Sequence, residues 1–235
     1  MQRGRFRSTA AITAAVAVAA ASWMLTHPGS ASEAPQTAPR PSGPALPPAD
    51  PSRPLTVIVR GWLWDPQSRR NPAPLTYFPQ QVNEHLQARY GLTTTLYQYR
   101  WSRIPKDLPA AIRDFVTFAR ALDERAAQQG HCVNFLGHSA GAAIVYAAAA
   151  EGVRMGYMGT LGLPTAGSAR PPSVTLWTNF YTTDSKDLAG VLWGRAMGAD
   201  RNVHAGAPHK ELWSSPQVID GSAEAIAAAW ASCHP

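Results

Sequence analysis

Short apolar runs alternate with amphipathic stretches along most of the chain, and this alternation predicts both strands and helices. Residues 55–60 (LTVIVR) form a β-branched apolar run closed by Gly61, which is typical of a buried strand. Residues 77–90 place apolar side chains at four-residue intervals from Phe78 to Tyr90, which predicts a helix with one apolar face. The same patterns predict strands at 93–99 and 132–136, and helices at 107–129 and 140–150.

The C-terminal part continues the alternation. It predicts strands at 157–163, 174–181 and 202–205, and helices at 188–197 and 216–231. Strands that alternate with helices favour an α/β fold of about six mostly parallel strands, with helices on both faces. Ligands of such sheets bind where the strand order reverses, at the carboxyl ends of the strands. We expect the first and third strands to be neighbours at this reversal.

The first 54 residues differ from the rest of the chain. A basic segment at 1–7 precedes an uncharged, alanine-rich run at 8–26, and small residues follow up to residue 32. This order predicts a signal peptide at 1–32 or, alternatively, an N-terminal membrane anchor at 8–26. In either case the domain lies outside the cytoplasm, secreted or periplasmic. Residues 33–54 are rich in Pro and Ala and predict a disordered linker, so one domain remains at 55–235.

Composition excludes several classes of function. Hydrophobic residues make up 45% of the 235 residues, which suffices for a sizeable core. The formal charge is +6, but three of the 21 basic residues lie in the first seven positions. Residues 33–235 therefore carry 18 basic against 15 acidic side chains, and we expect no nucleic-acid partner. Neither metal-ligand spacing nor a phosphate or dinucleotide motif is present in the sequence, so we expect no metal and no cofactor.

The sequence 137–141 (GHSAG) is the strongest chemical signal. It follows the third predicted strand and opens the alanine-rich helix, so Ser139 lies on a sharp strand-to-helix turn. Glycine at both flanking positions avoids clashes where the chain crowds such a turn. The amides at the start of the helix also point toward Ser139. We interpret Ser139 as a candidate nucleophile.

From this motif outward, the chain resembles the α/β-hydrolase superfamily, and more narrowly its small lid-less lipases and esterases. The resemblance extends over the segments 57–62 (VIVRGW), 97–102 (YQYRWS), 159–168 (GTLGLPTAGS), 180–187 and 212–218. Arg60 stands where the family usually has His. The resemblance implies a single-domain α/β-hydrolase fold without a large cap domain. It also implies that the chain hydrolyses carboxylic esters through a Ser-His-Asp triad and an acyl-enzyme.

A serine hydroxyl needs a base within reach, which a carboxylate must orient. The order in this family is Ser, acid, His. His209 fits the base because it lies in a Gly/Pro-containing loop between the last strand and the last helix, whereas His204 is expected within the strand and packed into the sheet. The acid stays open between Asp187, favoured by its spacing, and Asp184. Either carboxylate can instead cap or open a helix near residue 185.

The resemblance places the oxyanion-binding amides on Trp62, after the first strand, and on Ala140, after the nucleophile. Cys132 begins the third predicted strand and Cys233 ends the last helix. Both positions lie at the same end of an α/β domain, which allows a disulfide, although Cys132 can equally be a buried thiol.

The predicted substrate is a small-molecule or lipid ester. Thioesterase, amidase and acyltransferase chemistry would use the same residues, and a catalytically silent binding module of the cell envelope is the alternative from a different class.

Overall fold

Six parallel strands form the centre of the computed structural model, which describes residues 46–47, 50–61, 73–101, 107–164, 168–183 and 194–233. The strand order is β2-β1-β3-β4-β5-β6, and every described pair is parallel. The α/β class and the number of strands are therefore confirmed. The strands are β1 Leu55–Val59, β2 Thr95–Tyr99, β3 Val133–His138, β4 Met155–Leu161, β5 Val174–Tyr181 and β6 Arg201–His204.

The strand order reverses at β1. Val59 of β1 pairs with Tyr99 of β2 on one side and with Gly137 of β3 on the other. The expected contact between the first and third strands is thus confirmed. The carboxyl ends of β1 and β3 meet at the reversal, where ligands of open α/β sheets bind.

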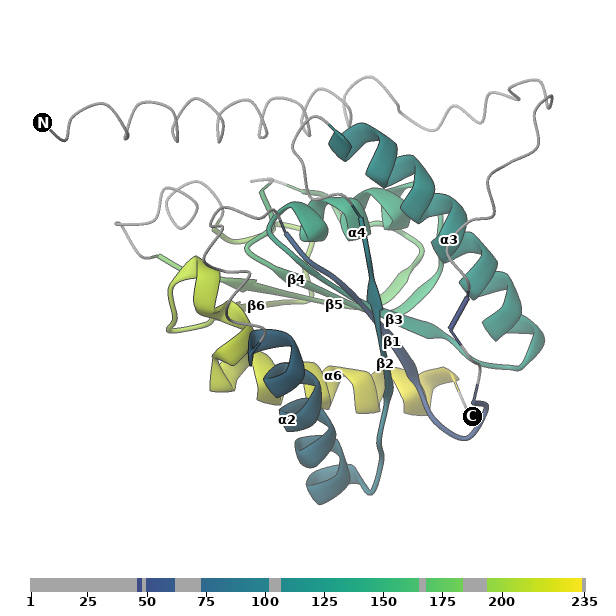
Figure 1. Cartoon of the computed structure of the whole chain (residues 1–235), viewed down its shortest axis with the longest axis horizontal. Helices are drawn as coiled ribbons and strands as arrows, with labels where there is room; N and C mark the ends of the chain where they lie inside the picture. The colour runs from purple at the N-terminus through teal and green to yellow at the C-terminus, as the bar shows by residue number, and fades with distance from the viewer. Residues whose placement is uncertain are drawn as a thin grey trace, which may run out of the picture.

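Helices cover both faces of the sheet (Figure 1). The pair α3 (Leu108–Gln128) and α4 (Ala140–Ala150) lies on one face, and the pair α2 (Ala73–Tyr90) and α6 (Pro216–Cys233) lies on the other. Alternate side chains of the strands point to opposite faces. Val57 and Val59 therefore join the core under α3 and α4, while Ile58 between them joins the core over α2 and α6.

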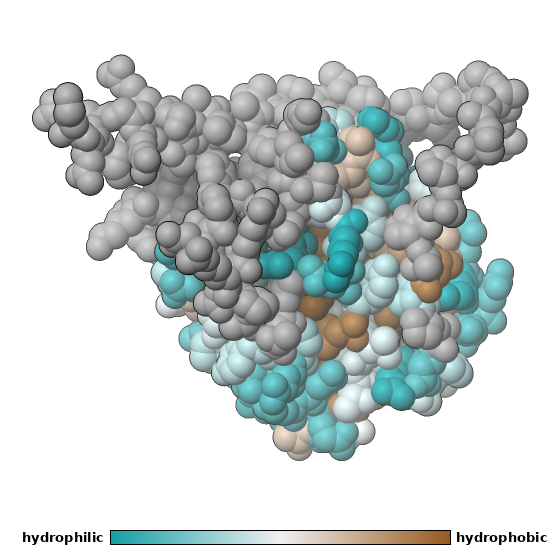
Figure 2. Space-filling view, in the orientation of Figure 1, coloured by the Kyte–Doolittle hydropathy of each residue, from teal (hydrophilic) through white to brown (hydrophobic). Residues whose placement is uncertain are grey.

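Helix α4 is apolar on all sides, and its residues 140–149 are all buried. A helix with this composition has no solvent-facing stripe, so it must be enclosed by its neighbours. Alanine and glycine side chains let it approach the sheet closely. Figure 2 shows that hydrophilic residues prevail on the described surface seen from this side, with only small, separated apolar areas.

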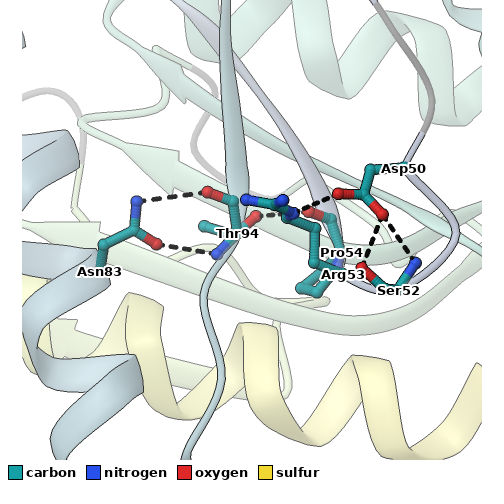
Figure 3. A network of polar contacts seen from close by, with 6 residues as sticks. All are labelled: Asp50, Ser52, Arg53, Pro54, Asn83 and Thr94. Carbon is teal, nitrogen blue, oxygen red and sulfur yellow. Dashed lines mark hydrogen bonds and ion pairs between the residues drawn. The ribbon is translucent and has the colours of Figure 1, made fainter.

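A polar network joins the start of the domain to α2 at the amino ends of the strands (Figure 3). Asn83 of α2 accepts a hydrogen bond from the amide of Thr94 (2.8 Å), and Thr94 Oγ1 donates to the carbonyl of Pro54 (2.9 Å). Asp50 accepts hydrogen bonds from Ser52 and pairs with Arg53 (2.6 Å). Residues 50–54, which directly precede β1, therefore form a hydrogen-bonded turn.

Two predictions about helices in the C-terminal part are corrected. The predicted helix at 188–197 is wrong over its described part, because residues 194–197 are not helical. The side chain of Asn202 bonds both the amide (2.8 Å) and the carbonyl (3.0 Å) of Ala196, and these groups are then not available to a helix. A 3-10 helix, η3 (His209–Ser214), was not predicted. Residues 188–193, and the export segment at 1–32, lie outside the described residues.

Cys132 and Cys233 form a disulfide, with their Cα atoms 6.0 Å apart. It joins the chain just before β3 to the last residue of α6, at the end of the sheet opposite the carboxyl ends of the strands. Among the helices of the described residues, none has the length and apolar character needed to cross a bilayer.

Candidate active site

Ser139 occupies a strained turn between β3 and α4. Its backbone angles are φ 56° and ψ −124°, and it is the one non-glycine residue with a positive φ in the described part of the chain. Such a conformation costs a residue with a Cβ about 1–3 kcal/mol, and it persists only where the surroundings enforce it. The amide of Ser139 donates to the carbonyl of Leu161 at the end of β4 (2.8 Å).

The flanking glycines are a steric requirement of this turn. A Cβ on Gly137 would overlap the backbone of Gly141, the second residue of α4. A Cβ on Gly141 would overlap the carbonyl of Val59 in β1. The start of α4 thus lies directly against the end of β1, which explains why the motif needs glycine on both sides of Ser139.

The turn after β1 touches the turn that contains Ser139. A Cβ on Gly61 would lie 2.7 Å from Cβ of Ser139 and 2.9 Å from the carbonyl of His138. Ala140 is the first residue of α4, so its amide has no acceptor within the helix and lies next to Ser139. Trp62, the other predicted oxyanion donor, lies outside the described residues.

His209 begins η3 and lies against the end of β4. A Cβ on Gly162 would overlap the imidazole ring of His209, so only glycine allows this approach. Because the amide of Ser139 is bonded to Leu161, the residue before Gly162, the nucleophile turn and the imidazole contact the same strand end. His209 as a whole is half-buried, but its Nδ1 atom is shielded from solvent. Burial of the imidazole lowers the pKa of His209 from 6.5 to about 4.

His138 contributes to the site, which the sequence interpretation missed. Its Nε2 lies 2.9 Å from the carbonyl of His209, so Nε2 carries the proton and donates to that oxygen. The two imidazole rings are 4.7 Å apart between centroids, and the ring of Trp213 lies 5.7 Å from that of His138. The available signal was a hydrogen-bonding aromatic residue next to Ser139, the candidate nucleophile. The hydrogen bond from His138 links the turn at Ser139 directly to the loop that contains His209.

Both candidate acids, Asp184 and Asp187, lie outside the described residues. The chain on either side of them is anchored by polar contacts. Asn179 of β5 donates to the carbonyl of Gly194 (3.0 Å) and to Asn202 of β6 (3.0 Å). The chain therefore leaves the sheet at the carboxyl end of β5 and enters it again at the amino end of β6.

His204 lies within the last strand, β6, as predicted, but the expected packing of its side chain into the sheet was wrong. Its side chain is exposed rather than packed into the sheet, and Nε2 lies 3.0 Å from Thr183 Oγ1. Two other carboxylates are engaged away from His209. Asp200 pairs with Arg170 and accepts the amide of Trp177 (2.8 Å), and Asp220 pairs with His85 (2.6 Å). Within the described ranges, no three His, Cys, Asp or Glu side chains are grouped to hold a metal ion.

The chain matches no protein-family model and no curated protein. Among solved structures, it is similar to a cutinase-like protein from Cryptococcus sp., with 15% identity, a TM-score of 0.44, and 74% of this chain and 95% of that one covered. It is also similar to a Trichoderma reesei cutinase in complex with a phosphonate inhibitor, with 14% identity, a TM-score of 0.41, and 96% and 91% covered.

Proposed function

We propose that this chain is a serine hydrolase of carboxylic esters, with Ser139 as the nucleophile and His209 as the base. The observation that carries the proposal is the shared strand end. Ser139 is forced into a positive φ on a turn bonded to Leu161, and the imidazole of His209 packs on Gly162, the next residue. A strained serine and a neutral imidazole that contact the same strand end support nucleophilic catalysis, which needs a base close to the serine.

The proposed reaction has two steps. Ser139 Oγ attacks the ester carbonyl while Nε2 of His209 accepts its proton, and the same proton then passes to the departing alkoxide. Water, deprotonated by His209, next attacks the acyl-enzyme and releases the acid and Ser139. The amides of Ala140 and Trp62 are proposed to stabilise the oxyanion, and Asp187 or Asp184 to orient His209.

The proposed location is outside the cytoplasm, secreted or periplasmic. The disulfide between Cys132 and Cys233 supports this proposal, because disulfides persist in oxidising compartments. The proposed substrate is a small-molecule or lipid ester. Thioesterase, amidase and acyltransferase activity share the same proposed residues and differ only in the acyl donor or acceptor.

Labelling with a fluorophosphonate tests the proposal directly, because the reagent reacts only with an activated serine. We expect intact-mass analysis of the protein to show one adduct, and the Ser139→Ala variant to show none. A folded wild-type protein that gains no adduct would contradict the proposal and favour a silent binding module.

The pH dependence of the reaction tests the role of His209. The base must be neutral, and burial lowers its pKa to about 4, so the labelling rate should stay constant as the pH falls from 8 to about 5. Below that range the rate should fall with an apparent pKa near 4. An acid limb near pH 6.5, the ordinary value for histidine, would contradict a base whose pKa is determined by burial alone and would indicate a carboxylate beside it.

Stability must be measured over the same range to exclude unfolding. The folded-state pKa of His209 lies below its unfolded value, so the unfolded chain binds the proton more tightly at low pH. The free energy of unfolding that His209 contributes is therefore complete above pH 6.5 and decreases as the pH falls toward 4. Circular dichroism at each pH identifies the points at which the protein remains folded.

A further inference from the structure

A polar hollow of about 290 Å³ lies at the carboxyl ends of β1 and β2, and the proposed triad does not use it. Val59 and Tyr99 are paired in the sheet, so the residues that follow them, Arg60 and Arg100, leave the two strands at the same level. The indole of Trp101 donates to the carbonyl of Arg60 (2.8 Å) and fixes the two strand ends together. The hollow is lined by Arg60, Gln98, Tyr99, Arg100 and Trp101.

This arginine hollow adjoins the candidate active site. Arg60 directly precedes Gly61, whose backbone lies against Ser139. Because Val59 also pairs with Gly137, Arg60 is level with His138 in the neighbouring strand. Adjacent strands are about 4.8 Å apart, so a group between β1 and β2 is about 7 Å from the line of β3. A substrate chain of moderate length reaches from the ester carbonyl to the hollow.

The lining of the hollow favours an anion. The guanidinium group of Arg100 offers planar pairs of N–H donors, which match the two oxygens of a carboxylate, and Arg60 adds a second positive charge. Two acidic residues also lie near the arginine hollow. Asp107 and Asp114 of the α3 region line a second hollow of about 250 Å³ that shares Arg100 and Trp101. Neither carboxylate forms an ion pair with Arg100 among the described residues.

We propose that the arginine hollow binds a free carboxylate of the substrate, so that the preferred esters carry a second, ionised acid group. This inference rests on the proposed function and specifies its substrate class. Arg100 binds the carboxylate, beside the positive charge of Arg60, while Ser139 attacks the ester carbonyl of the same molecule. No proton or electron is exchanged in the hollow, and its contribution is to bind and orient the substrate.

Two matched pairs of esters test the inference. One pair has the carboxylate on the acyl side: 4-nitrophenyl hydrogen glutarate against 4-nitrophenyl hexanoate. The other has it on the alcohol side: 4-butyryloxybenzoate against 4-butyryloxybenzamide. At pH 7 and low salt, we expect kcat/KM to favour the charged member of at least one pair by about tenfold, and 0.5 M NaCl to reduce this preference.

Substitutions of single arginines test whether the hollow causes the preference for the charged ester. Arg100→Gln should lower the preference for the charged ester about tenfold, and Arg100→Lys should lower it less because the charge stays. Arg89→Gln is the matched control. This exposed arginine lies in the last turn of α2, near the amino ends of the strands, so the same loss of charge there should leave both rates unchanged. A preference that Arg100→Gln does not alter, or no preference in either pair, would overturn the inference.

A binding measurement separates this inference from the proposed function. Calorimetry with glutarate and the Ser139→Ala protein does not depend on hydrolysis. Binding that Arg100→Gln weakens about tenfold, and Arg89→Gln does not, supports the hollow even if every ester proves inert. Absence of glutarate binding together with unselective hydrolysis would refute the hollow and leave the proposed function intact.

Discussion

A Ser139→Gly protein should be inactive toward esters and yet more stable than a Ser139→Ala protein. Both substitutions remove the proposed nucleophile, so we expect each to lower kcat about 10⁴-fold or more. They differ in the backbone. Ser139 has φ 56° and ψ −124°, a region that glycine adopts without cost and alanine does not.

The expected gain in stability is a balance of two terms. Relief of the strained backbone stabilises the folded glycine variant by about 1–3 kcal/mol. The greater conformational freedom of glycine in the unfolded chain offsets about 0.4–1 kcal/mol of this stabilisation. The net difference between Gly and Ala at this position should be about 1 kcal/mol, which raises Tm by about 2–4 °C in a domain of this size.

Thermal unfolding of the wild type and the two variants measures this difference. The Ala variant is the internal control, since it keeps the Cβ and loses only the hydroxyl. If the glycine variant melts at or below the alanine variant, the backbone at residue 139 is not strained. If either variant retains full esterase activity, Ser139 is not the nucleophile.

Loss of the disulfide should have the largest effect on stability. The bond between Cys132 and Cys233 closes a loop of 101 residues. For a loop of about this length, the restriction of the unfolded chain contributes about 4–5 kcal/mol. The double variant Cys132→Ser/Cys233→Ser should therefore melt about 10–15 °C lower than the wild type.

A reducing agent supplies the control for this prediction. It should lower Tm of the wild type by a similar amount and leave Tm of the double variant unchanged. The disulfide lies at the end of the sheet opposite the carboxyl ends of the strands. The folded double variant should therefore react with the fluorophosphonate at a rate within about twofold of the wild-type rate. A loss of stability below about 1 kcal/mol would mean that the bond adds little to the fold.

The elements that were predicted best are those whose signal is local. The strand at 174–181 and the helix at 140–150 agree with the structure at both ends, because an apolar run or an alanine-rich run determines them directly. The segment 194–197 was predicted as helix and is not, because Asn202, a residue of β6, takes the backbone groups of Ala196. Such competition between distant residues leaves no periodic trace in the sequence.

The residues of the candidate site also differ in whether a local sequence feature marks them or only the folded structure brings them together. Ser139 is marked by its two glycines and its place between a strand and a helix, both of which are local features. The contact of His138 with the carbonyl of His209 joins residues 71 positions apart and depends on how β3 and η3 pack. The arginine hollow likewise arises only when β1 and β2 pair, because Arg60 and Arg100 are 40 residues apart in the sequence.

The end of β4 contacts both of the proposed catalytic residues. Ser139 is fixed to Leu161 by a backbone hydrogen bond, and His209 rests on Gly162. A thermal displacement of this strand end carries the serine and the imidazole in the same direction, so their separation changes less than the position of either one. Substitutions far away that shift β4 as a whole should therefore be tolerated, whereas a change between Leu161 and Gly162 would misalign the pair.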